Sequence, residues 1–112
     1  MARTEPITLL FHWSPTTRRK GIIRYGLRPG MRPSVSTPGW KPPYVCFADS
    51  PSWAWALSGD MHSEIESWDL WQTWTNLLSG YEKLPGWGNH KTHEIRTYER
   101  VYKRDLWYVG TR

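Results

Sequence analysis

The feature that most restricts the fold is an abrupt change of hydrophobic period at a proline near the start of the chain. Residues 7–13 alternate with period two, which predicts a strand, and Pro15 is expected to end its pairing. A helical pattern of about ten residues follows at once, with Thr16 or Thr17 as the expected N-cap. This order places His12 near the end of the strand, where the chain turns back across the sheet.

The helix that follows has a clear end and leads into a long irregular segment. We expect Ile22, Ile23 and Leu27 to form its buried stripe, and Gly26 to provide a left-handed C-cap. Residues 28–43 are rich in proline and have no regular pattern. Long ordered loops are often functional, so we expect this one to lie over a ligand pocket.

The remaining chain predicts a second helix and four more strands. Asp49 and Ser50 precede Pro51, a pattern typical of a helix start. The expected strands are 44–48, 68–75, 92–102 and 106–110; the expected helix is 52–57, and 60–66 and 76–92 are expected to be irregular. We therefore predict one α+β domain over residues 1–112, with a mostly antiparallel sheet, two short helices and long loops.

Composition narrows the class of protein without choosing a function. A single cysteine, Cys46, excludes a disulfide framework, and no apolar run is long enough for a membrane span. The net charge of +5 is compatible with a nucleic acid or an anionic cofactor. His90 and His93 lie near Glu94 but precede a strand, so we expect no metal site. We expect a soluble, cytoplasmic monomer without membrane association.

Three blocks in chain order carry a resemblance to a known family: Phe11-His12-Trp13-Ser14, residues 45–55 and residues 92–98. Together they resemble the ADP-ribosyltransferase superfamily, in particular its poly(ADP-ribose) polymerase branch. The first, Phe11-His12-Trp13-Ser14, is similar to the family's strand ending His-Gly-Ser or His-Gly-Thr. Residues 45–55 resemble its Tyr-Phe-Ala-Asp…Ser-x-x-Tyr segment. Residues 92–98 resemble the late strand with the catalytic Glu, and residues 106–109 resemble the final edge strand.

The resemblance implies a single small ADP-ribosyltransferase-like domain with a split antiparallel β-sheet core. It also implies NAD as substrate and a role for each matched residue. His12 would bond a ribose hydroxyl, and Glu94 would stabilise the positive charge that develops on the sugar. The backbone of Trp13 and the hydroxyl of Ser52 would hold the carboxamide, and Trp55 would stack on nicotinamide. Glu94 is expected to face the same cleft as His12.

Two positions depart from the family pattern: Trp13 replaces a glycine, and Cys46 replaces the first stacking tyrosine. Tyr44 is the candidate to replace that aromatic wall, and Ser14 completes the expected cofactor-binding set. The expected function is NAD-dependent ADP-ribosylation of a protein or nucleic acid, as in a phage or toxin-type effector.

Two alternatives stay open. The first is an inactive module of the same fold that binds a host protein or nucleic acid through its arginine-rich first helix and exposed tryptophans. The second is an RNA 2′-phosphotransferase-like activity, for which Arg18, Arg19 and Arg96 are candidate phosphate ligands.

Overall fold

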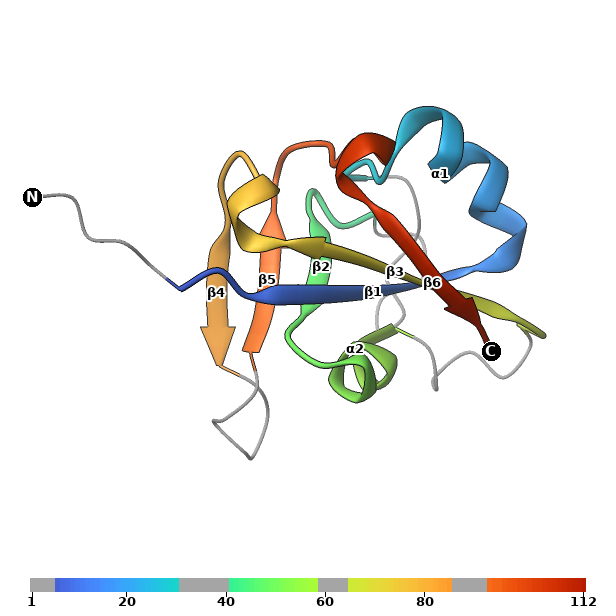
Figure 1. Cartoon of the computed structure of the whole chain (residues 1–112), viewed down its shortest axis with the longest axis horizontal. Helices are drawn as coiled ribbons and strands as arrows, with labels where there is room; N and C mark the ends of the chain where they lie inside the picture. Colours follow the sequence, from blue (N-terminus) through green and yellow to red (C-terminus); the bar gives the residue numbers. More distant parts are fainter. Residues whose placement is uncertain (1–5, 31–40, 59–64, 86–92) are drawn as a thin grey trace, which may run out of the picture.

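The computed structural model describes residues 6–30, 41–58, 65–85 and 93–112. These ranges form a small compact α+β domain with a six-stranded antiparallel sheet and two short helices, as the sequence predicts (Figure 1). The strands are β1 (Leu9–Pro15), β2 (Val45–Ala48), β3 (Trp68–Trp74), β4 (Glu82–Pro85), β5 (His93–Thr97) and β6 (Trp107–Thr111). The helices are α1 (Arg19–Tyr25) and α2 (Pro51–Ser58), and the 3-10 turns are η1 (Thr16–Arg18), η2 (Thr75–Leu77) and η3 (Lys103–Asp105).

The strand order β4-β5-β2-β1-β3-β6 divides the sheet into two halves. In Figure 1, β4, β5 and β2 run up and down the view, whereas β1 and β3 run across it. Pairing between the halves is sparse, because β1 and β2 share the single register pair Phe11 and Ala48. β1 and β3, in contrast, pair along their whole length, from Leu9 opposite Trp74 to Pro15 opposite Trp68. Pro15 is the last residue of β1, so the strand ends at this proline as expected, although Pro15 itself still pairs with Trp68.

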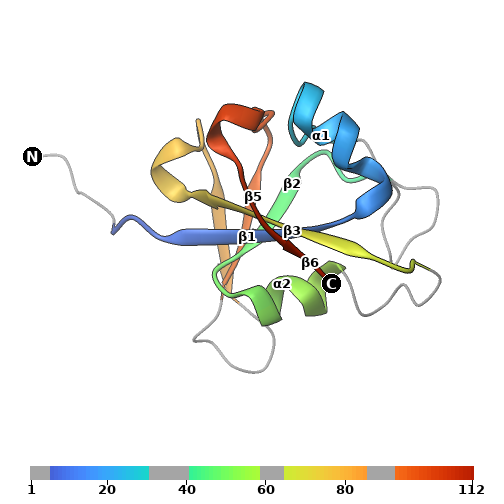
Figure 2. The ribbon, with the colours of Figure 1, turned by 45° about the vertical axis from the view of Figure 1, so that its right-hand side comes forward.

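The two helices cover opposite faces of the sheet. Ile22 of α1 packs in a core cluster with Leu10, Phe47 and Ile95. Ala54 of α2 belongs to a second cluster on the other face, whose buried members are Trp13, Ala48, Ala54, Trp68 and Leu70. Figure 2 shows α1 and α2 on opposite sides of β1 and β3. Large aromatic rings fill the second cluster, so tryptophan supplies much of the buried area.

The start of α1 differs from the expected form. Neither η1 nor α1 has a side-chain cap, so the predicted capping role of Thr16 or Thr17 is wrong. Ile22 and Leu27 are buried as expected, but Ile23 is 51% exposed. At the other end, Gly26 takes φ +75°, a positive value that favours glycine.

Helix α2 begins as its sequence predicts. The backbone N–H of Trp53 donates to Ser50 Oγ at 3.1 Å, so Ser50 caps the first turn beside Pro51. No helix within the described ranges combines the length and the apolar character needed to cross a membrane.

The second half of the chain shows two further differences. β5 ends at Thr97, although a strand through residue 102 is expected; the chain then bends, and Val101 forms an isolated bridge with Leu27. β4 forms within a segment expected to be irregular and pairs with β5 at the sheet edge. Residues 31–40, most of the long proline-rich loop, lie outside the described residues.

Candidate functional site

The three sequence blocks come together on neighbouring strands. β2 carries the second block and lies between β1, which carries His12, and β5, which carries Glu94. Ala48 pairs with Phe11 on one side and with Glu94 on the other, so these three side chains share one face of the sheet. One strand therefore separates the first and third blocks, although they are far apart in the chain.

His12 lies at the junction between the two halves of the sheet. Its half-buried ring lies 5.6 Å from the ring of Phe47, and its Nδ1 lies 2.7 Å from the carbonyl oxygen of Cys46. A carbonyl only accepts hydrogen bonds, so Nδ1 carries a proton in this contact. Next to Phe11 in an alternating strand, His12 lies on the face opposite to Glu94, not on the same face as expected.

Glu94 is held by one arginine. Its Oε2 forms an ion pair with Nε of Arg96, two residues further along the same face of β5, and its side chain is 13% exposed. Within the described ranges, Oε1 of Glu94 has no hydrogen-bond partner. The carboxylate is thus fixed through one oxygen, and the other can interact with a ligand.

Arg96 connects Glu94 to Tyr44. The guanidinium of Arg96 lies 4.3 Å from the ring centroid of Tyr44, whose ring packs edge to face with Tyr98 at 6.0 Å. Burial lowers the pKa of Arg96, but the hydrogen bond and charge of Glu94 outweigh burial, so its pKa lies above the ordinary value. Burial raises the pKa of the Tyr44 phenol. Tyr44 therefore stacks on an arginine in this structure.

The tryptophans of the predicted site pack against each other. Trp13 is 8% exposed, and its indole N–H donates to the carbonyl of Pro51 at 2.9 Å. Trp55 packs edge to face with Trp13 at 5.2 Å and with Trp68 at 5.6 Å. The guanidinium of Arg112 covers Trp55 at 4.1 Å. These contacts join α2 to β1, β3 and the C-terminal residue.

The two predicted serines have different surroundings. Ser14 is buried in β1 and pairs with Asp69 of β3. Ser52 is exposed in the first turn of α2, with its Oγ 3.4 Å from that of Ser50. The structure thus places Ser52 and Trp55 on α2, over the sheet face that also carries Glu94. Ser14 lies apart from them, in β1 opposite Asp69 of β3.

A side-chain contact that links the end of β2 to the start of β5 was not expected from the sequence. Asp49, directly after β2, accepts hydrogen bonds from the backbone N–H of His93 at 3.0 Å and from its ring Nδ1 at 3.0 Å. These two hydrogen bonds fix His93, the first residue of β5, beside Glu94. Within the described ranges, no group of three or more His, Cys, Asp or Glu residues is placed to hold a metal ion.

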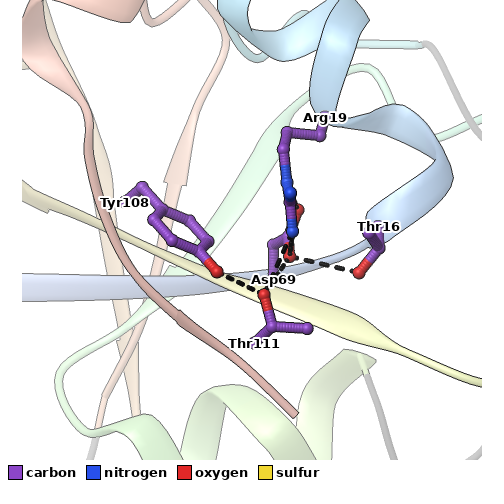
Figure 3. Close-up of polar contacts among 5 residues, drawn as sticks. All are labelled: Thr16, Arg19, Asp69, Tyr108 and Thr111. Carbon is purple, nitrogen blue, oxygen red and sulfur yellow. Dashed lines mark hydrogen bonds and ion pairs between the residues drawn. The ribbon is translucent and has the colours of Figure 1, made fainter.

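Sequence reasoning also missed a polar cluster around Asp69 in β3 (Figure 3). Arg19 donates to both carboxylate oxygens, from Nε at 2.8 Å and from Nη2 at 2.7 Å. Hydroxyls of Thr16 and Thr111 donate to Oδ1 at 3.1 and 2.7 Å, and Tyr108 bonds Thr111. The Asp69 side chain is fully buried, and its hydrogen bond with Arg19 is the main cause that lowers its pKa. The sequence signal that could have indicated this cluster is an aspartate, Asp69, between Trp68 and Trp71 in a predicted strand.

The three candidate phosphate ligands do not form one group. Arg19 is bound to Asp69 at the start of α1, and Arg96 is bound to Glu94 on β5. Arg18 lies in η1, next to Arg19. Comparison of the chain with protein-family models, curated proteins and solved structures gives no match.

Proposed function

We propose that the protein transfers ADP-ribose from NAD, with Glu94 as the catalytic carboxylate. The observation that carries the proposal is the adjacency of β1, β2 and β5, which brings the three family-like blocks together. The final family-like block also falls on β6, an edge strand, as the resemblance implies.

The chemistry requires a fixed carboxylate near the anomeric carbon. The bond between C1′ of the ribose and the nicotinamide nitrogen breaks, and its electron pair neutralises the pyridinium. Positive charge develops on the sugar, and a preorganised carboxylate stabilises it. The acceptor attacks C1′, and its proton leaves to the carboxylate or to water. Glu94, anchored through Oε2 by Arg96, supports this role through Oε1.

His12 lies on the other face of the sheet from Glu94 and does not carry the proposal. Its Nδ1 donates to the carbonyl of Cys46, and its ring lies 5.6 Å from that of Phe47. Because His12 and Glu94 lie on opposite faces next to the single β1–β2 pair, one ribose does not lie against both side chains, and the role that the resemblance gives to His12 stays a prediction.

A second candidate function is binding without turnover, and the packing of Trp13 and Trp55 favours it. Trp13 stands where the family has glycine, and its ring fills space between β1 and α2. Trp55, the expected nicotinamide stack, contacts Trp13, Trp68 and Arg112. A ligand would have to displace these contacts to stack on Trp55.

Two measurements on the purified protein separate the candidates. Nicotinamide release from labelled NAD reports bond cleavage, and thermal unfolding with NAD, ADP-ribose or nicotinamide reports binding, because a ligand of the native state raises its Tm. Transfer predicts release of nicotinamide and a rise in Tm with ADP-ribose. If neither nicotinamide release nor a Tm shift is observed, transfer is contradicted and the binding module remains.

A further inference from the structure

Two tyrosines lie on the surface where α1 meets η3, and each is flanked by arginines. We call this the Arg–Tyr surface, and its members are Arg24, Tyr25, Arg28, Arg100, Tyr102 and Arg104. The Tyr25 ring has the Cζ atoms of Arg24 and Arg28 at 5.2 and 4.7 Å from its centroid. Tyr102 has those of Arg100 and Arg104 at 5.2 and 5.0 Å. Tyr25 is 40% exposed, and Tyr102 is 45% exposed.

A rigid backbone contact holds the two parts of the surface together. Leu27 and Val101 exchange backbone hydrogen bonds of 2.8 and 2.9 Å in an isolated antiparallel bridge. Gly26 allows this approach, because a Cβ there would lie 2.1 Å from the Val101 carbonyl oxygen. In Figures 1 and 2, the red turn before β6 lies beside α1. The two tyrosines are therefore held near each other in the folded chain.

The charge of this region is strongly positive. Residues 19–28 and 98–105 hold seven basic side chains and two acidic ones, Glu99 and Asp105. Asp105 lies 3.9 Å from Arg104. Within the described ranges, no carboxylate pairs with Arg24, Arg28 or Arg100. These guanidinium groups can therefore bind an external anion without breaking an ion pair.

We propose that the Arg–Tyr surface binds single-stranded nucleic acid. Arginines contact phosphates, and aromatic rings stack on bases, the combination that single-strand-binding surfaces use. A base that stacks on Tyr25 or Tyr102 displaces a guanidinium group from that ring, and the guanidinium can then contact a phosphate. In a duplex the bases stack on each other, so they are not available to stack on the tyrosine rings. An acidic protein would use the arginines but not the stacking faces. The proposal does not depend on ADP-ribosyl transfer, because binding is measured without NAD.

The test is fluorescence anisotropy with a short labelled single strand, over a series of salt concentrations. A duplex of the same sequence and polyglutamate serve as competitors. The Arg28→Gln/Arg100→Gln variant removes two positive charges from the surface. Lys83→Glu on β4, at the opposite edge of the sheet, changes the net charge by the same amount and is the matched control. Thermal unfolding checks that each variant is folded.

We expect the double arginine variant to reduce the slope of log K against log salt by about 1.4, from two lost contacts. Tyr102→Leu should weaken binding about fivefold or more and leave the slope unchanged. Lys83→Glu should change the affinity and the salt dependence far less than these variants do. The proposal is overturned if the single strand does not bind at low salt, if Lys83→Glu weakens binding equally, or if the duplex or polyglutamate competes as well as the single strand.

Discussion

Asp69 and Glu94 are both strand carboxylates paired with an arginine, but their surroundings differ. Asp69 is fully buried, and its two oxygens accept four hydrogen bonds from Arg19, Thr16 and Thr111. Glu94 is 13% exposed and is bound through one oxygen by Arg96. A carboxylate with both oxygens hydrogen-bonded holds the fold, whereas one held through a single oxygen remains able to act on a ligand. We infer that Asp69 joins α1, β3 and β6, and that Glu94 serves the site.

The largest effect expected from this comparison is the loss of stability on removing the Asp69 charge. Asp69→Asn leaves Arg19 without its anion and leaves an amide N–H₂ facing donors, so the free energy of unfolding should fall by about 3 kcal/mol. Urea unfolding measures this loss. Asp105→Asn, in the exposed pair with Arg104, is the control and should cost less than about 1 kcal/mol. Similar losses at both positions would contradict the structural role of Asp69.

A smaller effect is expected from replacing each arginine by lysine. Arg19 donates to both oxygens of Asp69 through two N–H groups, a geometry that lysine cannot reproduce, so Arg19→Lys should lower the free energy of unfolding more than Arg96→Lys does. Arg96 is partly exposed and makes one bond to Glu94, so Arg96→Lys should cost about 1 kcal/mol or less. Chemical denaturation of both variants tests this order. A larger loss in Arg96→Lys would reverse the comparison.

The smallest effect concerns acid stability. The folded-state pKa of Asp69 lies below its ordinary value of 3.8, chiefly because of the Arg19 hydrogen bond. Its contribution is therefore complete above about pH 4–5 and is lost as the pH falls through the folded-state pKa. Unfolding free energies across this range should fall less steeply in Asp69→Asn than in the unaltered protein. Parallel curves would show that Asp69 does not carry this pH dependence.

Local signals account for the parts of the fold that the sequence predicts. Alternating apolar residues identify β1 and β3, and Ser50 with Pro51 identifies the start of α2. β4 has no such signal, because Glu82 and Lys83 are exposed and the strand forms by pairing with β5 at the edge. Period alone does not identify an edge strand of this kind.

Contacts between distant segments decide what the sequence could not predict about the site. The residue types at His12 and Glu94 are visible in the sequence, and the resemblance pairs them. The Cys46 carbonyl that holds His12, and the side of the sheet that each residue takes, depend on the register between β1, β2 and β5. Likewise, nothing local indicates that Arg19 reaches Asp69, fifty residues later.

The central claim is that Glu94 acts on the substrate and contributes little to the fold, and Glu94→Gln tests it most directly. Gln keeps the size of the side chain but removes the charge, and Glu66→Gln, an exposed residue before β3, is the matched control. We predict that nicotinamide release from NAD falls by about 100-fold or more in Glu94→Gln. Its free energy of unfolding should stay within about 1 kcal/mol of the unaltered protein. Unchanged release, or a loss of stability as large as that of Asp69→Asn, would contradict the account.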